Sequence, residues 1–438
     1  MLPACGHALN PPLDSSHPLA GKTVYIPRMA QGSAEAFSSV FRWLGVDALP
    51  TPPSNERTLE LGGRWTSGDE CFPAKVTVGD FLRILEDPAN VPSRTVFFMP
   101  TAEGPCRFGQ YAPFLQRILR QAGFADVHIL SPTSKNAYAD LGELANRFLR
   151  VGWRALVAAD LLRKALLKTR PYEATPGEAE RVYEECLQDV SETIESSCGE
   201  MKCQLRSLAA CMTRCRERFR RVPARYDNGV PLIGVVGEIF CRLNTFSNED
   251  LVRKLENYEA EAWVSDIVEW LAYTNAEQAR KLRLEGKAWS LEMGKALLRR
   301  RIQEADEHAL LAPWRDDFSG YEEPPIETVL ELARPYLPAG GAMGEMVLSI
   351  GKAAYLAMQG ADGIVDISPF TCMNGIVSEA IYPKLSKDYG GIPIRNFYFD
   401  GTQSDLDRDL GIYMELARSY REKKTFRRRL PQYFAAGA

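Results

Sequence analysis

Short apolar runs that alternate with helical stretches constrain the fold of this chain most strongly. The runs have strand length, are rich in β-branched or aromatic residues, and are followed by apolar residues at helical spacing. Strands that alternate with helices form parallel βαβ units. We therefore predict an α/β fold. The expected strands are Thr23–Arg28 (TVYIPR), Arg94–Met99 (RTVFFM), Val127–Leu130 (VHIL), Pro231–Val236 (PLIGVV), Gly363–Ile367 (GIVDI) and Ile394–Phe399 (IRNFYF), with a shorter one at Ala262–Ser265.

Helices are expected between these strands. Gly45 ends the first one, since glycine often terminates helices, and Ser247 is a suitable N-cap for another. The expected helices are Gly32–Leu44, Gln110–Gln121, Ser247–Glu256, several within Ile267–Leu311, one from Gly375 and one from Ser404.

Between the two strand-containing regions lies a charged stretch without any strand signal. It is rich in helix formers, is interrupted at Arg170-Pro171, and ends at Pro223. We predict two Rossmann-like parallel-sheet domains with a helical middle region. The division is a flexible leader (1–22), an N-terminal α/β domain (23–137), a helical region (138–225), a C-terminal α/β domain with a helical insertion (226–421) and a basic tail (422–438).

Charge and hydropathy exclude several classes of protein. The net charge of −4 over 438 residues lacks the basic surplus of a nucleic-acid-binding protein. The basic stretch Arg418–Arg429 is interpreted as a solvated terminal helix. No apolar run reaches the roughly 18–20 residues of a membrane span, and the N-terminus lacks the pattern of a signal peptide. A cytoplasmic location is expected.

In that compartment, ten cysteines favour metal ligation or redox chemistry over structural disulfides. Three of them lie in loops flanked by Gly or Pro: Cys71 in GDECFPAK, Cys106 in EGPCRFGQY and Cys372 in SPFTCMNG. Cys106 and Cys372 follow predicted strands. Parallel α/β sheets bind their ligands in the loops at the carboxyl ends of the strands, which is where these two cysteines are expected. All three precede predicted helices, whose N-termini are expected to lower the thiol pKa.

Cysteine thiolates are the usual ligands of iron–sulfur clusters. Four would saturate a cubane, whereas three would leave one iron open, as catalytic zinc sites keep an open position. The spacing by itself also fits three ordinary buried thiols, and that alternative stays open at this point.

Four passages resemble the 2-hydroxyacyl-CoA dehydratase/benzoyl-CoA reductase superfamily. They are GDECFPAK, EGPCRFGQY, GEIFCRLNTFSNEDLVRKLE and DISPFTCMNGIVSEAI, and the resemblance extends from about residue 23 to 421. More narrowly, they resemble the activase-related branch, akin to double-cubane cluster proteins. The resemblance implies stacked α/β domains with a [4Fe–4S] cluster in the cleft between them, ligated by Cys71, Cys106 and Cys372.

The same resemblance implies low-potential, single-electron chemistry of an oxygen-sensitive reductase or dehydratase, or of its subunit. The implied partners are an ATP-hydrolysing activator with its own iron–sulfur cluster, a second copy or related subunit, and an acyl-CoA or other small substrate. Two positions depart from the family pattern. Asn374 stands where Pro is common, and Cys241 stands where an apolar residue is expected.

Other cysteines allow an alternative cofactor, a double-cubane [8Fe–9S] cluster, which needs about six thiolates. Only the helical group Cys198, Cys203, Cys211 and Cys215 could supply the extra ones. A buried helix face lined with small thiols is the competing interpretation. No role is assigned to Cys5 or Cys186.

Polar residues beside the proposed ligands are candidates for catalysis. Glu103 and Arg107 flank Cys106, and Glu238 ends a predicted strand. Arg107 could offset cluster charge or hold an anionic substrate, and Glu238 could shuttle a proton. Glu70, Lys75 and Asp400 lie in comparable positions. Each of these groups could instead be a helix cap or a surface ion pair.

Several common motifs are absent from the sequence. There is no Gly-x4-Gly-Lys-Ser/Thr loop, no Gly-x-Gly-x-x-Gly fingerprint and no His-Glu-x-x-His motif. ATP hydrolysis is therefore assigned to the partner. Three hypotheses follow: a redox enzyme, a non-catalytic electron relay or scaffold subunit, and a cluster-free binding protein.

Overall fold

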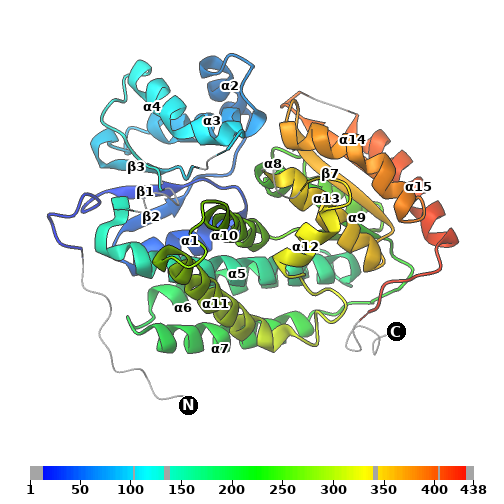
Figure 1. The fold of residues 1–438 in the computed structure, drawn as a ribbon. Helices are drawn as coiled ribbons and strands as arrows, with labels where there is room; N and C mark the ends of the chain where they lie inside the picture. Colours follow the sequence, from blue (N-terminus) through cyan, green and yellow to red (C-terminus); the bar gives the residue numbers. More distant parts are fainter. Residues whose placement is uncertain (1–12, 102–103, 133–138, 339–343, 403–404, 431–438) are drawn as a thin grey trace.

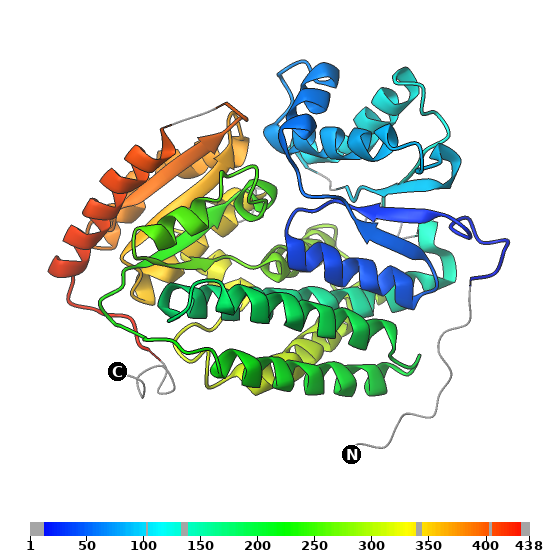
Figure 2. The same ribbon diagram turned by 180° about the vertical axis from the view of Figure 1, so that it is seen from behind.

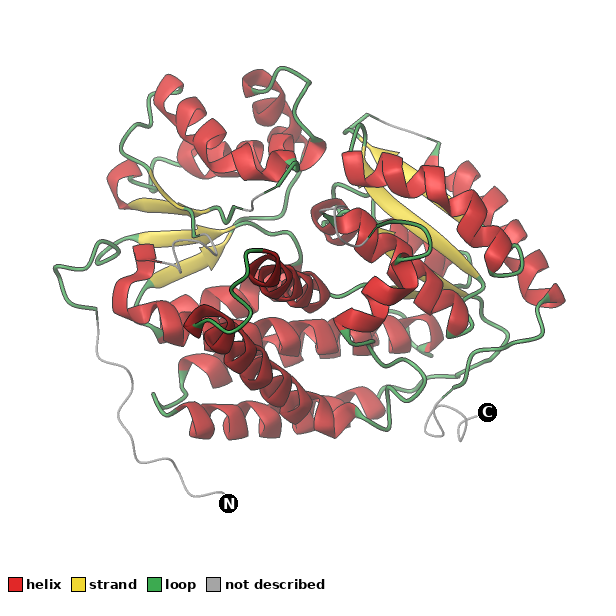
Figure 3. Ribbon diagram, in the orientation of Figure 1, coloured by secondary structure: helices red, strands yellow, loops and turns green. Residues whose placement is uncertain are grey.

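The computed structural model describes residues 13–101, 104–132, 139–338, 344–402 and 405–430. Two parallel sheets lie side by side above a layer of long helices (Figure 1). The strands of the two sheets are separate from one another (Figure 3). The predicted α/β fold with two parallel sheets is thereby confirmed.

The N-terminal sheet has the strand order β2-β1-β3-β4, and all of its pairs are parallel. Alternate residues of its strands point to opposite faces. Val24 and Val96 therefore pack on one face, and Tyr25 and Phe97 on the other. The strands are β1 Thr23–Ile26, β2 Asp47–Pro50, β3 Thr95–Phe98 and β4 His128–Leu130.

The C-terminal sheet has the order β6-β5-β7-β8, also with parallel pairs only. Both central strands are continuously buried, as expected for strands covered on two faces. The strands are β5 Leu232–Gly237, β6 Glu261–Val264, β7 Gly363–Pro369 and β8 Ile394–Phe399.

Helices cover both sheets and form the layer beneath them. The N-terminal half contains α1 Gln31–Trp43, α2 Glu56–Trp65, α3 Phe72–Glu86 and α4 Tyr111–Gln121. The middle contains α5 Ala145–Thr169, α6 Glu178–Glu195 and α7 Met201–Arg220. The C-terminal half contains α8 Ile239–Leu243, α9 Leu251–Asn257, α10 Ile267–Leu284, α11 Leu291–Leu311, α12 Ile326–Ala333, α13 Glu345–Met358, α14 Met373–Asp388 and α15 Leu406–Lys423.

Short 3₁₀ helices connect some of these elements. They are η1 Pro92–Arg94, η2 Arg107–Gln110, η3 Ala139–Leu144, η4 Arg170–Tyr172 and η5 Ala312–Trp314.

One apolar core joins the N-terminal sheet to the helical middle. Its members come from β1, β3, α1, α5, α6 and α7. Helix α5 also supplies Leu167 to the core of the C-terminal sheet. The green helices of residues 145–220 accordingly lie beneath both sheets (Figure 2). This shared layer fixes the position of one sheet relative to the other.

In each half, two helices that approach each other closely at a glycine come just before the third strand in chain order, which is β3 in the first sheet and β7 in the second. In α3, a Cβ at Gly79 would lie 1.9 Å from the backbone oxygen of Thr58 in α2. In α13, a Cβ at Gly351 would lie 2.0 Å from the backbone oxygen of Val329 in α12. Any larger side chain would push either pair apart.

Two local predictions are wrong. Ser247 is not an N-cap, because residues 244–250 form turns held by the side chains of Asn244 and Asn248, and α9 begins only at Leu251. The basic tail is not solvated throughout. Arg428 is buried and pairs with Glu261 at 2.5 Å, so its positive charge compensates a buried carboxylate and does not face solvent.

The sequence prediction leaves out β2 and the helices α2, α8, α12 and α13. Within the described ranges, no helix has the length and apolar character needed to cross a membrane.

Candidate functional site

The three predicted cysteine ligands each stand immediately before a helix. Cys71 is the N-cap of α3, Cys106 the N-cap of η2, and Cys372 the N-cap of α14. All three have extended backbone conformations. Each thiol is therefore carried by a loop that enters a helix, as the sequence predicted.

Arg107 connects the three cysteine loops. Its Nη1 donates to the backbone oxygen of Asp69 at 2.5 Å, two residues before Cys71. Its Nη2 donates to the backbone oxygen of Thr371 at 2.9 Å and to Thr371 Oγ1 at 3.2 Å. Thr371 precedes Cys372, and Arg107 itself follows Cys106. One guanidinium thus holds three loops that are distant in sequence.

A second hydrogen bond joins the same ends of the two sheets. Asn244 Nδ2, just after α8, donates to the backbone oxygen of Arg28, just after β1, at 2.9 Å. In open parallel sheets, ligands bind beyond the carboxyl ends of strands where the strand order reverses. The strand order reverses between β1 and β3 in the N-terminal sheet and between β5 and β7 in the C-terminal sheet. The hydrogen bond from Asn244 to Arg28 joins the loops that follow β5 and β1, so the two reversal points face each other.

The three thiols differ in exposure. Cys106 is exposed, Cys71 is partly buried, and Cys372 is only 8% exposed. The sulfur of Cys71 lies 2.5 Å from the hydroxyl oxygen of Tyr111 in α4. The site is therefore reachable from the surface on the Cys106 side and closed on the Cys372 side.

Two carboxylates lie beside the cysteines. Glu238 follows β5 and caps α8, where it accepts hydrogen bonds from the backbone N–H groups of Phe240 and Cys241 at 3.1 and 2.8 Å. Glu345 begins α13 and accepts from the N–H of Ile239 at 2.9 Å. Burial raises the pKa of Glu238, and burial together with Glu238 raises the pKa of Glu345 to about 8. A carboxyl group that keeps its proton near neutral pH, that of Glu345, is thus available at the site.

The predicted lowering of the thiol pKa values is wrong. Burial raises the pKa of Cys106 to about 11, and it also raises the pKa of Cys71 and of Cys372. Glu238 raises all three further, while first-turn backbone N–H groups act in the opposite direction. The helix N-termini are present, but desolvation and the nearby carboxylate outweigh them.

Cys241 is a fourth thiol in this neighbourhood. It lies in α8, is fully buried, and has its pKa raised by burial, by Glu238, and by the nearby Cys372 and Cys71. In the sequence, Cys241 stands out only as a cysteine where an apolar residue is expected, and no role was predicted for it. Its place three residues after Glu238, just beyond a predicted strand, would have indicated that it lies near the site.

The remaining polar candidates have local partners. Glu70 accepts from the N–H of Ser67 at 2.8 Å, and Asp400 accepts from the N–H of Thr402 at 2.8 Å. The positive charge of Lys75 lowers the pKa of Asp400, but by less than the hydrogen bonds from Thr402 do. Glu103 lies outside the described residues.

The helical cysteines belong to another part of the molecule. Cys186, Cys211 and Cys215 are members of the core between the N-terminal sheet and the middle helices, whereas Cys71 and Cys241 belong to the other cores. Cys203 is not a free thiol. Asp189, Cys211 and Cys215 form a group that could hold a metal ion.

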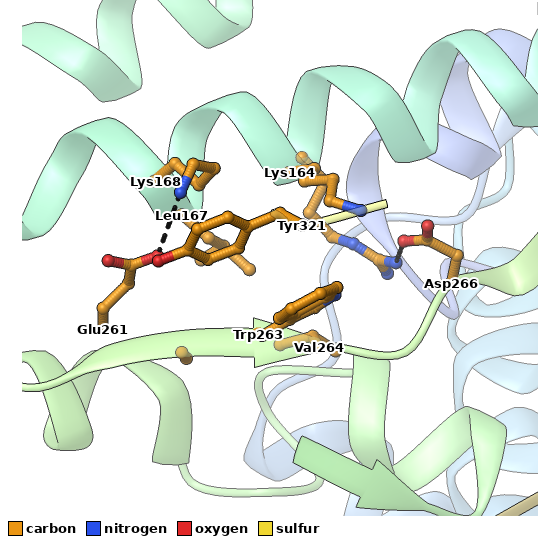
Figure 4. A pocket seen from close by; sticks show the side chains of 10 residues that line it. Lys164, Leu167, Lys168, Glu261, Trp263, Val264, Asp266 and Tyr321 are labelled. Atoms are coloured by element: carbon orange, nitrogen blue, oxygen red, sulfur yellow. Dashed lines mark hydrogen bonds and ion pairs between the residues drawn. The ribbon is translucent and has the colours of Figure 1, made fainter. Parts of the chain in front are cut away.

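A separate small cavity, lined by charged and aromatic side chains, lies between α5 and β6 (Figure 4). Lys168 pairs with Glu261 at 3.4 Å and lies over the ring of Tyr321, while Asp266 pairs with Arg163 at 2.9 Å. The cavity volume is about 10 Å³, room for about one water molecule. Since its charges are paired and its space is small, this region joins α5 to the C-terminal sheet and is not a substrate site.

The chain matches no protein-family model and no curated protein sequence.

Proposed function

We propose that Cys71, Cys106 and Cys372 together hold one [4Fe–4S] cluster and that the chain carries out low-potential, single-electron reduction. The observation that supports this most strongly is the set of contacts of Arg107, which tie the three cysteine loops to one another. Three thiols on three helix N-termini, gathered at the carboxyl ends of two sheets, suit a ligand bound between the two halves.

The donor set fits a cluster better than a single ion. Among the described residues, only Asp189, Cys211 and Cys215 bring three ligand atoms within 4.8 Å of one another, so at least one pair of the loop sulfurs is more than 4.8 Å apart. The sulfurs around a cubane lie about 6–7 Å apart. A mononuclear zinc site would need ligand atoms about 3.5–3.8 Å apart, given Zn–S bonds of about 2.3 Å.

When bound, such a cluster supplies single electrons and one iron without a protein ligand. The protein's own residues have distinct tasks around it. Arg107 positions the loops, and its hydrogen bonds to backbone oxygens leave it little capacity to bind a substrate anion. Tyr111 and Glu345 retain their protons at neutral pH, because burial raises the pKa of each. Glu345 is the better proton donor, since its pKa of about 8 lies close to neutrality.

The remaining parts of the proposal follow from the family resemblance. Electrons come from an ATP-hydrolysing activator with its own cluster, and the substrate is an acyl-CoA or another small unsaturated molecule. The exposed side of the site, at Cys106, is where a substrate or an electron donor would approach.

Anaerobic purification tests the cluster directly. We expect a brown protein with about four irons and four sulfides per chain. Substitution of Cys71, Cys106 or Cys372 by Ala should each reduce iron to below about 0.5 per chain. Cys198→Ala is the matched control, because this thiol is free and buried in the other part of the molecule. A colourless, iron-free wild-type protein would refute the proposal.

Two further outcomes separate the alternatives. About eight irons per chain, lost on Cys211 or Cys215 substitution, would favour the double-cubane cluster. To separate an enzyme from an electron relay, candidate substrates are added to the reduced protein and the EPR spectrum is recorded. A changed spectrum supports catalysis at an open iron, whereas no response to any candidate favours the relay.

A further inference from the structure

Helices α6 and α7 bring four potential metal ligands together below the N-terminal sheet. Cys186 and Asp189 are three residues apart on α6, and Cys211 and Cys215 are four residues apart on α7. Residues at these spacings share one face of a helix. The short connection between the helices sets these two faces against each other, and the pair shares one core.

The distances favour a single ion. The ligand atoms of Asp189, Cys211 and Cys215 all lie within 4.8 Å of one another. A tetrahedral site with Zn–S bonds of about 2.3 Å and Zn–O bonds of about 2.0–2.2 Å needs ligand atoms about 3.5–3.8 Å apart. Small rotamer adjustments cover that difference. The spacing is too tight for the sulfurs of a cubane.

The surroundings of the group resemble those of a metal site. Arg218, one turn after Cys215, pairs with Asp189 at 2.8 Å and so orients its carboxylate. Thr193 interacts with the thiol of Cys211, and the thiols of Cys215 and Cys186 interact with each other. Such outer partners hold ligands in place. Cys186, Cys211 and Cys215 are fully buried, while Asp189 is partly exposed and offers an entry path.

Charge balance selects the kind of ion. Two thiolates and a carboxylate would be costly to bury together without compensation. A divalent cation and Arg218 neutralise them. Two soft sulfur donors favour Zn²⁺ over the oxygen-seeking Mg²⁺ and Ca²⁺.

We propose that Asp189, Cys211 and Cys215 bind one soft divalent cation of the Zn²⁺ class, with Cys186, whose thiol interacts with that of Cys215, as the candidate for the fourth position. The ion clamps α6 to α7, as structural zinc sites join separate segments of a fold. This site is distinct from the cysteine loops and does not depend on the function proposed for them.

Zinc loading of the full chain tests the site. The protein is incubated with Zn²⁺, desalted and assayed for bound metal, and Co²⁺ is added separately as a spectroscopic probe. We expect a zinc content in wild type that exceeds that of the C211A/C215A double variant by about one ion per chain, and a thiolate-to-cobalt charge-transfer band that the double variant lacks. Asp189→Asn should weaken Zn²⁺ binding by about 10-fold or more.

Several controls keep the test decisive. Cys198→Ala should retain the zinc, and so should a protein in which Cys71, Cys106 and Cys372 are all replaced by Ala. If the double variant fails to fold, the Asp189→Asn measurement decides, because this partly exposed position tolerates a neutral isostere. Equal zinc in wild type and both variants, or loss of the zinc in the loop variant, would overturn the proposal. Because iron is measured in the same samples, failure here is distinguishable from failure of the cluster proposal.

Discussion

The N-terminal and C-terminal sheets have the same strand order when strands are counted within each half, second-first-third-fourth. In both, a helix pair packed through a glycine precedes the third strand, and a cysteine follows that strand. Cys106 and Cys372 therefore occupy corresponding places, one after β3 and the other after β7.

The halves differ where the helix before the third strand begins. In the N-terminal half, Cys71 caps α3, whereas Gly344 and Glu345 start α13 in the C-terminal half. One half thus contributes two thiols, and the other contributes the thiols of Cys372 and Cys241 together with two carboxylates, Glu345 and Glu238. The backbone arrangement is shared, and the chemistry depends on single residues at helix N-termini.

Adding one methyl group at the glycine of each helix pair tests whether the two pairs pack in the same way. Gly79→Ala and Gly351→Ala would each place a Cβ about as close to a backbone oxygen of the neighbouring helix, 1.9 and 2.0 Å away. We expect each to lower the free energy of unfolding by about 2–3 kcal/mol, measured from urea midpoints.

Gly294→Ala is the matched control for these two substitutions. Gly294 is also helical, but nothing lies within 4 Å of the place that an added Cβ would occupy, so alanine should stabilise by about 0.5–1 kcal/mol. If only one of Gly79→Ala and Gly351→Ala destabilises the protein, the close helix contact contributes to stability in one half and not in the other.

The contact between the halves is tested by Arg107→Gln. This change removes hydrogen bonds to both Asp69 and Thr371. Because the side chain is exposed, we expect a loss of about 1 kcal/mol in unfolding free energy. Iron retained after anaerobic purification should fall as well, since the loops are no longer held together. Arg120→Gln, an exposed arginine of α4, is the control, and an equal effect in both would contradict the assigned role.

The smallest effect, when measured near pH 4, is expected for Glu345→Gln in the iron-free protein. The pKa of Glu345 is raised from 4.5 to about 8, so the folded state binds the proton more tightly than the unfolded state. Wild-type stability should therefore fall as the pH rises from about 4.5 to about 8, and the variant should lack this fall.

Urea unfolding at pH 4 and pH 9 measures that difference. At pH 4 the two proteins should agree within about 0.5 kcal/mol, because the carboxyl group is then largely neutral in both the folded and the unfolded state and is isosteric with the amide. At pH 9 the variant should be the more stable one. Parallel pH profiles would show that Glu345 is ionised in the folded state.

Much of the fold could be predicted because it depends on local patterns. The buried run of β5 and the run of β8 lie within a residue of their predicted positions, and the three cysteines stand at helix starts as expected. Strand and helix periodicity act over a few residues, so they can be recognised without knowledge of the partners.

The electrostatics of the site could not be predicted in the same way. Each thiol does cap a helix, which favours ionisation, yet burial and Glu238 raise the pKa values instead. Burial depends on the elements that cover a residue, and Glu238 is far from all three cysteines in the sequence.

The sequence by itself therefore determined the α/β class, the strands and the loops that carry the thiols, because these follow from short-range periodicity and turn residues. Only the tertiary structure decided that the loops meet. Arg107 and Thr371 are 264 residues apart, and their contact exists because α5 packs beneath both sheets and sets their carboxyl ends against each other. Contacts of that separation depend on the packing of whole layers, which no local pattern encodes.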